Sequence, residues 1–163
     1  MQSKNNALRR AFSMLELIAV VVMIGLISAM AMLSVGGQLD QVRLNRASQS
    51  IANADRKERE ASRQSPTPGG LSIDRVKQRL RFSNSKHTLS LDTRLKLGEI
   101  IVSPVSMDRG SITFAQSGQS PTYAIEMKSR RGASQWIVIV GMTGQTWLTD
   151  DTAEVRSLMA MGR

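Results

Sequence analysis

Few side chains in this sequence are suited to catalysis. The chain has 163 residues, no cysteine and a single histidine, His87. The lack of cysteine excludes disulfides, thiolate metal sites and a cysteine nucleophile, and one histidine cannot build a multi-histidine metal centre. His87 has no acid beside it in sequence, which favours a surface position over a catalytic base. Because no phosphate-binding glycine loop or catalytic carboxylate pair is recognisable, we expect a protein that is not an enzyme and binds no cofactor.

Asp150, Asp151 and Glu154 form a compact acidic group near the C-terminus. Carboxylate oxygens of this kind are the ligands that Ca²⁺ prefers. Their spacing fits no defined calcium loop, however, and a solvated turn accounts for them. We therefore predict no metal site.

Cations recur at every second position in one segment. They are Arg75, Lys77, Arg79 and Arg81. In a β-strand this spacing places all four on one face, while Val76, Leu80 and Phe82 enter the core. One explanation is a solvent-exposed face of the sheet whose charges discourage pairing with the edge strands of other molecules. The more specific explanation is contact with DNA or another anion. Aromatic side chains that could stack on bases make up only 4% of the chain, so a nucleic-acid partner stays open but is not favoured.

Residues 12–35 form an apolar run whose only charge is Glu16. As a helix this run would extend about 36 Å, which is enough to cross a bilayer. Lys4, Arg9 and Arg10 come directly before it, and such cations stay on the cytoplasmic side. We therefore expect a single-pass inner-membrane protein with a cytoplasmic N-terminus and a periplasmic C-terminal domain.

An ionised Glu16 inside this run would be costly and usually marks a partner. A cut between Ala11 and Phe12 would create an α-amino cation on Phe12 that could pair with Glu16 of the same or a neighbouring chain. A secretory signal would have a shorter apolar core followed by its cleavage site. We therefore expect a short basic leader and a retained apolar helix.

The residues around this cut resemble the class III signal of type IV prepilins and type II secretion pseudopilins. They are RRA at 9–11 and FSMLELI at 12–18. In that family a prepilin peptidase/methyltransferase cleaves before the phenylalanine and methylates its new amine, and the glutamate directs docking with other pilin subunits. The resemblance implies cleavage between Ala11 and Phe12, N-methylation of Phe12 and an assembly role for Glu16. Two departures are Ala11 in place of the usual glycine and the lack of a mid-segment proline.

After the apolar run the pattern becomes that of an amphipathic helix over residues 36–65. Its apolar stripe consists of Leu44, Ala47, Ile51, Ala54 and Ala61. Glu58 interrupts this stripe near its end. Packing under a sheet is favoured over a coiled-coil seam, which would need larger residues and more heptads. The prolines and glycines of residues 65–70 should end the helix.

From residue 70 onward the apolar period becomes two, which predicts strands. The candidates are residues 76–82, 89–97, 99–103, 111–115, 122–128, 136–141 and 145–148. No second long helix is visible. A long helix followed by strands predicts an α+β fold in which the second half of the helix packs on an antiparallel sheet or on two small sheets.

Four parts are thus expected along the chain. They are a cleaved leader (1–11), a transmembrane or filament-core helix (12–35), an amphipathic stalk helix (36–65) and a periplasmic β-rich domain (66–163). The last part is similar to the GspH/FimT group of minor pilins. The matching segments are ITF at 112–114, SG at 117–118, AIEM at 124–127, WIVIV at 136–140 and TGQT at 143–146.

Together the two resemblances imply a GspH-like minor pseudopilin that assembles with other pilin-type subunits into the type II secretion pseudopilus and supports protein secretion. The alternative is a FimT-like minor type IV pilin that binds DNA during uptake through the cations at 75–81. DNA affinity that falls steeply with salt would favour this alternative. A third interpretation is a prepilin-like protein that is processed but enters no filament.

Overall fold

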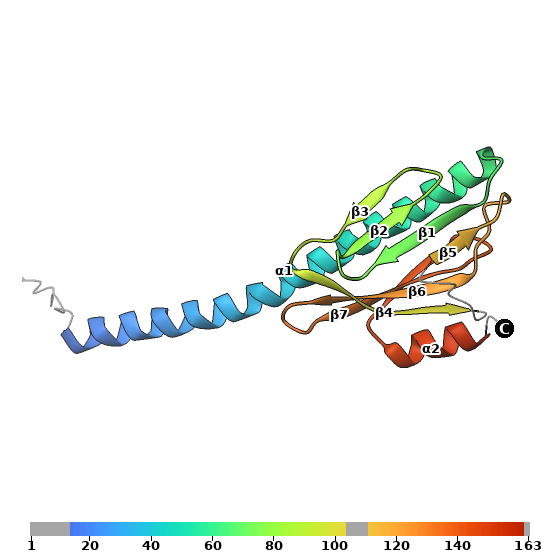
Figure 1. The fold of residues 1–163 in the computed structure, drawn as a ribbon. Coiled ribbons are helices and arrows are strands. Elements are labelled where there is room, and N and C mark those ends of the chain that lie inside the picture. The colour runs from blue at the N-terminus through green and yellow to red at the C-terminus, as the bar shows by residue number, and fades with distance from the viewer. Residues whose placement is uncertain (1–13, 104–110, 162–163) are drawn as a thin grey trace, which may run out of the picture. The chain divides into compact units, whose positions relative to one another are not determined.

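The computed structural model describes residues 14–103 and 111–161. The chain divides into two compact units, Met1–Gln38 and Leu39–Arg163. Helix α1 (Met14–Gln64) supplies the described part of the first unit and begins the second. The other elements are β1 (Gly69–Asp74), β2 (Arg79–Phe82), β3 (Thr88–Ser90), β4 (Leu95–Ser103), β5 (Ser111–Phe114), β6 (Thr122–Ser129), β7 (Ser134–Ile139), β8 (Thr146–Thr149) and α2 (Thr152–Met161) (Figure 1).

The predicted membrane-spanning segment is corrected by the structure. Within residues 14–103 and 111–161, no helix combines the length and the apolar character that crossing a membrane requires. The described apolar side chains at the start of α1 lie within residues 14–30. Glu16 also lies within this stretch. The predicted single-pass inner-membrane localisation is therefore wrong.

The second part of α1 packs as a helix with one buried side. It ends at Gln64, directly before Pro66 and Pro68, as the breaker residues predict. Leu44, Ile51 and Ala54 of the predicted stripe are buried. Polar residues complete the buried side, namely Ser48, Asp55, Glu58, Arg59 and Ser62. Because buried polar groups need hydrogen-bond partners, this side of α1 must contact polar groups of the sheets as well as their apolar faces.

The strands form two antiparallel four-stranded sheets, with strand orders β3-β2-β1-β5 and β4-β6-β7-β8. β4 is one strand with an irregular register between Leu97 and Ile100, where the sequence predicted two separate strands. Bulges of this kind bend a strand without ending it. The predicted α+β class, with a helix packed on antiparallel sheets, is confirmed.

One apolar core joins α1 to both sheets within the second unit. The sheet residues in this core are Leu71, Leu80, Phe82, Ile112 and Phe114 from the first sheet and Leu95, Leu97, Tyr123, Ile125, Met127, Ile137 and Ile139 from the second. Alternate residues of each strand point to one face of a sheet, so this set defines the inner faces. The outer face of sheet β3-β2-β1-β5 is therefore the polar one.

Helix α2 covers the other face of sheet β4-β6-β7-β8 (Figure 1). Val155 and Met159 of α2 pack there against Trp136 and Val138. The Trp136 indole N–H also donates to the Thr152 hydroxyl at 3.2 Å. The period-two pattern from which the strands were predicted contains no signal for this short helix. Both faces of the second sheet are consequently buried near β7.

The strand predicted over residues 76–82 is shorter than expected. Residues 75–78 form the turn between β1 and β2, and Val76 is 94% exposed, so its predicted place in the core is wrong. The turn is made by Asp74, whose Oδ1 accepts from the backbone N–H of Val76 at 3.0 Å and of Lys77 at 2.9 Å. Gln78 adopts a positive φ of 52° there. No glycine or proline marks this turn, and the period-two pattern therefore continued through it in the sequence.

Candidate functional site

The described part of the first unit is a helix with apolar side chains exposed on all sides. Leu15 is 79% exposed and Ile27 is 67% exposed. The other exposed large apolar residues there are Met14, Leu17, Ile18, Val20, Val21, Val22, Met23, Ile24, Leu26 and Met30. Exposed apolar surface of this extent normally marks a contact with another molecule. We call residues 14–30 the apolar helix segment.

Glu16 lies in the first turn of this segment, where a carboxylate also complements the partial positive charge of a helix N-terminus. The predicted processing residues, Ala11 and Phe12, lie outside the described residues.

The buried carboxylate of Glu58 fastens the first sheet to α1. It accepts the backbone N–H groups of Gly70 at 3.1 Å, Asn84 at 2.9 Å and Ser85 at 2.8 Å, and the hydroxyl of Ser83 at 3.2 Å. Burial raises the pKa of Glu58, but the backbone N–H bonds outweigh burial and hold this pKa below its ordinary value. Glu58 is therefore the charged acceptor for the ends of β1 and β2.

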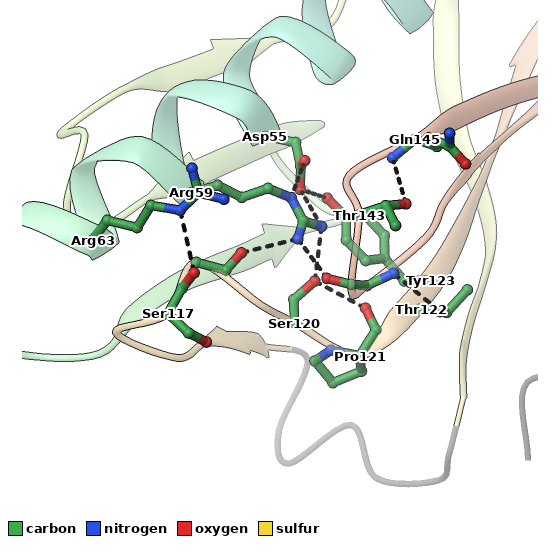
Figure 2. A network of polar contacts seen from close by, with 12 residues as sticks. Asp55, Arg59, Arg63, Ser117, Ser120, Pro121, Thr122, Tyr123, Thr143 and Gln145 are labelled. Carbon is green, nitrogen blue, oxygen red and sulfur yellow. Dashed lines mark hydrogen bonds and ion pairs between the residues drawn. The ribbon is translucent and has the colours of Figure 1, made fainter.

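The neighbouring buried residue, Arg59, fastens the second sheet to α1 (Figure 2). Its guanidinium pairs with the Asp55 carboxylate at 2.7 Å. It also donates to the carbonyl oxygens of Gly118 at 3.0 Å and Gly141 at 2.6 Å and to the hydroxyl of Ser120 at 2.9 Å. These acceptors lie in the connections from β5 to β6 and from β7 to β8. One side chain thus ties two connections to the helix.

Tyr123 on β6 is a further member of this network. Its hydroxyl donates to Asp55 Oδ1 at 2.6 Å (Figure 2). Complete burial and the adjacent Asp55 carboxylate raise the pKa of Tyr123 well above its ordinary value. The hydroxyl therefore stays protonated and keeps donating.

We call Asp55, Glu58 and Arg59 the polar clamp. Their partners are backbone groups and side chains of the protein itself, so the clamp holds the fold together. Sequence reasoning missed it and treated Glu58 as an interruption of the apolar stripe. The available signal was the spacing of three and four residues that continues the stripe from Ile51 through Asp55 and Glu58 to Ser62.

The structure separates the four predicted anion contacts. Arg79 and Arg81 lie on β2, whereas Arg75 and Lys77 lie in the turn before it, so the predicted four-residue strand face is wrong. Three of the four cations nevertheless surround one hollow of about 200 Å³. Its lining residues are Ser72, Asp74, Lys77, Arg79, Arg81 and Thr88. We call it the basic hollow.

The acidic residues near the C-terminus serve α2. Asp151 Oδ1 accepts from the backbone N–H of Ala153 at 2.7 Å, which is an N-cap contact. Glu154 accepts from the Thr149 hydroxyl at 2.6 Å. Among the described residues, no group of three or more acids or histidines is placed to hold a metal ion. The carbonyl of His87 accepts from Phe82 N–H at 2.8 Å, so the backbone of His87 takes part in the β2–β3 pairing.

The fold of this chain, a long N-terminal helix packed on two antiparallel sheets, is similar to that of a minor pseudopilin. A solved structure of the minor pseudopilin EpsH from the type 2 secretion system of Vibrio cholerae matches with a TM-score of 0.51 and 14% sequence identity, over 66% of this chain and 96% of that chain. A crystal structure of EpsH from the same organism also matches with a TM-score of 0.51 and 14% identity, over 65% of this chain and 92% of that one. At this identity the likeness shows a shared fold.

No protein-family model matches the sequence, and no curated protein matches it either.

Proposed function

We propose that this chain is a minor, GspH-like pseudopilin that assembles with other pilin-type subunits into a type II secretion pseudopilus and supports protein secretion. The fold supports this proposal, because two solved structures that share it are those of a minor pseudopilin from such a system. The prepilin-like residues around Phe12 support it independently. The proposed role is structural, with no catalytic step.

The apolar helix segment is the observation that carries the proposal. Burying a Val, Leu, Ile or Met side chain contributes roughly 1.5–3 kcal/mol. A dozen such side chains exposed around one helix therefore provide a strong driving force for association, even after the entropy cost of assembly. The equivalent helices of other pilin-type subunits would provide matching apolar partners.

Glu16 would set the register of this packing. We propose that a prepilin peptidase/methyltransferase cleaves between Ala11 and Phe12 and methylates the new amine of Phe12. Glu16 would then accept from the Phe12 amine of an adjacent subunit. A pair of opposite charges between apolar helices is favourable only when both charges meet, so it selects one axial position.

Cross-linking tests this assembly. The chain has no cysteine, so a cysteine introduced at Ile27 would be unique. In cells that carry a type II secretion system, we expect this variant to form disulfide cross-links with a pilin-type subunit bearing one cysteine in its own N-terminal helix. Adding Glu16→Ala should lower the cross-linking yield about tenfold, the effect of about 1.4 kcal/mol.

Glu60→Ala is the matched control, because Glu60 is an exposed carboxylate on the part of α1 that belongs to the second unit. It should leave the yield unchanged. Cross-links that form equally well with unrelated apolar helices, or that do not respond to Glu16→Ala, would contradict the proposed assembly.

A further inference from the structure

The basic hollow lies on the outer face of sheet β3-β2-β1-β5. Cross-strand pairing explains its composition, because Ser72 pairs with Arg81 and Arg81 pairs with Thr88, while Asp74 pairs with Arg79. Residues paired across antiparallel strands point to the same face, so their side chains converge. Strands β1, β2 and β3 lie side by side in this order (Figure 1).

The cations of the hollow outnumber its one carboxylate. Lys77, Arg79 and Arg81 form no ion pair among the described residues. The carboxylate of Asp74 is the one acid in the lining, which leaves a formal charge of about +2 when three cations and one carboxylate are counted. Clustered like charges repel one another, so an anion placed between them would be attracted by all three.

The turn that carries Lys77 is anchored and not loose. Asp74 accepts two of its backbone N–H groups, from Val76 and Lys77. At the end of the turn, the backbone carbonyl of Gln78 accepts from Leu91 N–H at 3.1 Å, and the side-chain oxygen of Gln78 accepts from Leu97 N–H. Lys77 is therefore presented from a fixed backbone beside the two arginines of β2. Fixed donors lose less entropy when they bind a ligand.

We propose that the basic hollow binds one phosphate group. Two guanidinium groups, one ammonium group and the hydroxyls of Ser72 and Thr88 offer donors on several sides, which suits the oxygens of a phosphate better than the two of a carboxylate. Arg75 does not line the hollow, nor do Lys86, Arg94, Lys96, Arg130 or Arg131. The hollow is thus a discrete site, and its phosphate group belongs either to a small molecule or to the backbone of a nucleic acid.

Titration calorimetry of the full-length chain with pyrophosphate tests the site. We expect saturable binding of one pyrophosphate per chain, weakened at least about tenfold in the double variant Arg79→Gln/Arg81→Gln, which removes two charge-assisted contacts. The double variant Arg130→Gln/Arg131→Gln removes the same charge from an exposed turn between β6 and β7 and should leave the affinity nearly unchanged.

Asp74→Asn provides a test in the opposite direction. The asparagine side-chain oxygen can still accept from the two turn amides, while the negative charge in the hollow is lost. Pyrophosphate should therefore bind severalfold more tightly to this variant than to the wild type. Unchanged thermal melting of each variant would show that the turn is preserved.

A fluorescently labelled oligonucleotide identifies the source of the phosphate. If the oligonucleotide binds, is displaced by pyrophosphate and no longer binds to Arg79→Gln/Arg81→Gln, the site is one for nucleic acid. If pyrophosphate binds but the oligonucleotide does not, the site is one for a small phosphate compound. The site is overturned if pyrophosphate does not saturate the chain, or if both double variants weaken binding equally. Neither result depends on filament assembly, so the test stands apart from that of the proposed function.

Discussion

Glu58 shows how a residue that breaks a sequence pattern can stabilise the fold. In the sequence it interrupts an apolar helix stripe, yet its carboxylate is buried and accepts hydrogen bonds from four donors. Those donors lie 12 to 27 residues further along the chain, in β1 and in the loop after β2, which no helix periodicity describes. The buried side of α1 was therefore predictable from spacing, whereas the partners of its polar residues were not.

Glu58→Gln should destabilise the protein by about 1–3 kcal/mol. The substitution replaces one of the two carboxylate oxygens, which accept backbone N–H groups, with an NH2 group that can only donate. The effect should depend on pH. Since the pKa of Glu58 is lower in the folded chain than its ordinary value of 4.5, its stabilisation is complete above that pH and is lost as the pH falls through the folded pKa. Urea unfolding at a series of pH values measures both effects.

Glu60→Gln is the control for this substitution, because Glu60 is exposed on the same helix. It should alter stability by less than about 0.5 kcal/mol. The free energy of unfolding of the wild type should fall between neutral and acidic pH more than that of Glu58→Gln. An equal fall in both would contradict the proposal that the charge on Glu58 holds the loops.

The elements were predictable where one face of each is apolar. Leu80 and Phe82 of β2, and the alternating residues of β6 and β7, lie in the core as their period-two pattern indicates. The prediction failed at Val76, because an Asp74 side chain and a positive φ at Gln78 make a turn where no glycine or proline announces one. It also missed α2, whose two buried residues, Val155 and Met159, are too few to establish a helical period.

The attachment of α1 to the connections between strands depends on Arg59. Arg59→Met keeps an unbranched apolar side chain there but leaves the Asp55 carboxylate and the carbonyls of Gly118 and Gly141 without this donor. Removing one member of a buried ion pair typically costs about 3–5 kcal/mol, so we expect a loss of this size in the free energy of unfolding. Urea denaturation measures it directly.

Arg63→Met is the comparison one helical turn away. Arg63 is largely exposed and makes only a 3.2 Å bond to the Ser117 carbonyl and a 3.7 Å pair with Glu60, so its loss should cost at most about 1 kcal/mol. If Arg59→Met and Arg63→Met lowered the free energy of unfolding equally, the buried contacts of Arg59 would stabilise the protein no more than the surface contacts of Arg63.

For the molecule as a whole, composition and periodicity predicted the α+β class and a long N-terminal helix, and the structure confirms both. They left open whether the strands form one sheet or two small ones, since strand pairing joins segments far apart in sequence, and the structure has two four-stranded sheets. Hydropathy also predicted a membrane span, which no helix among the described residues provides. The basic hollow arises only when three strands are paired, although the sequence had singled out its cations.

Processing of the N-terminus tests the pseudopilin proposal most directly. The intact mass of the chain should be measured after expression with a matched prepilin peptidase, without that peptidase, and for Glu16→Ala. We predict that the wild-type chain begins at a methylated Phe12 only when the peptidase is present, and that Glu16→Ala is assembled less well. A wild-type chain that retains Met1 despite an active, matched peptidase would contradict the proposal.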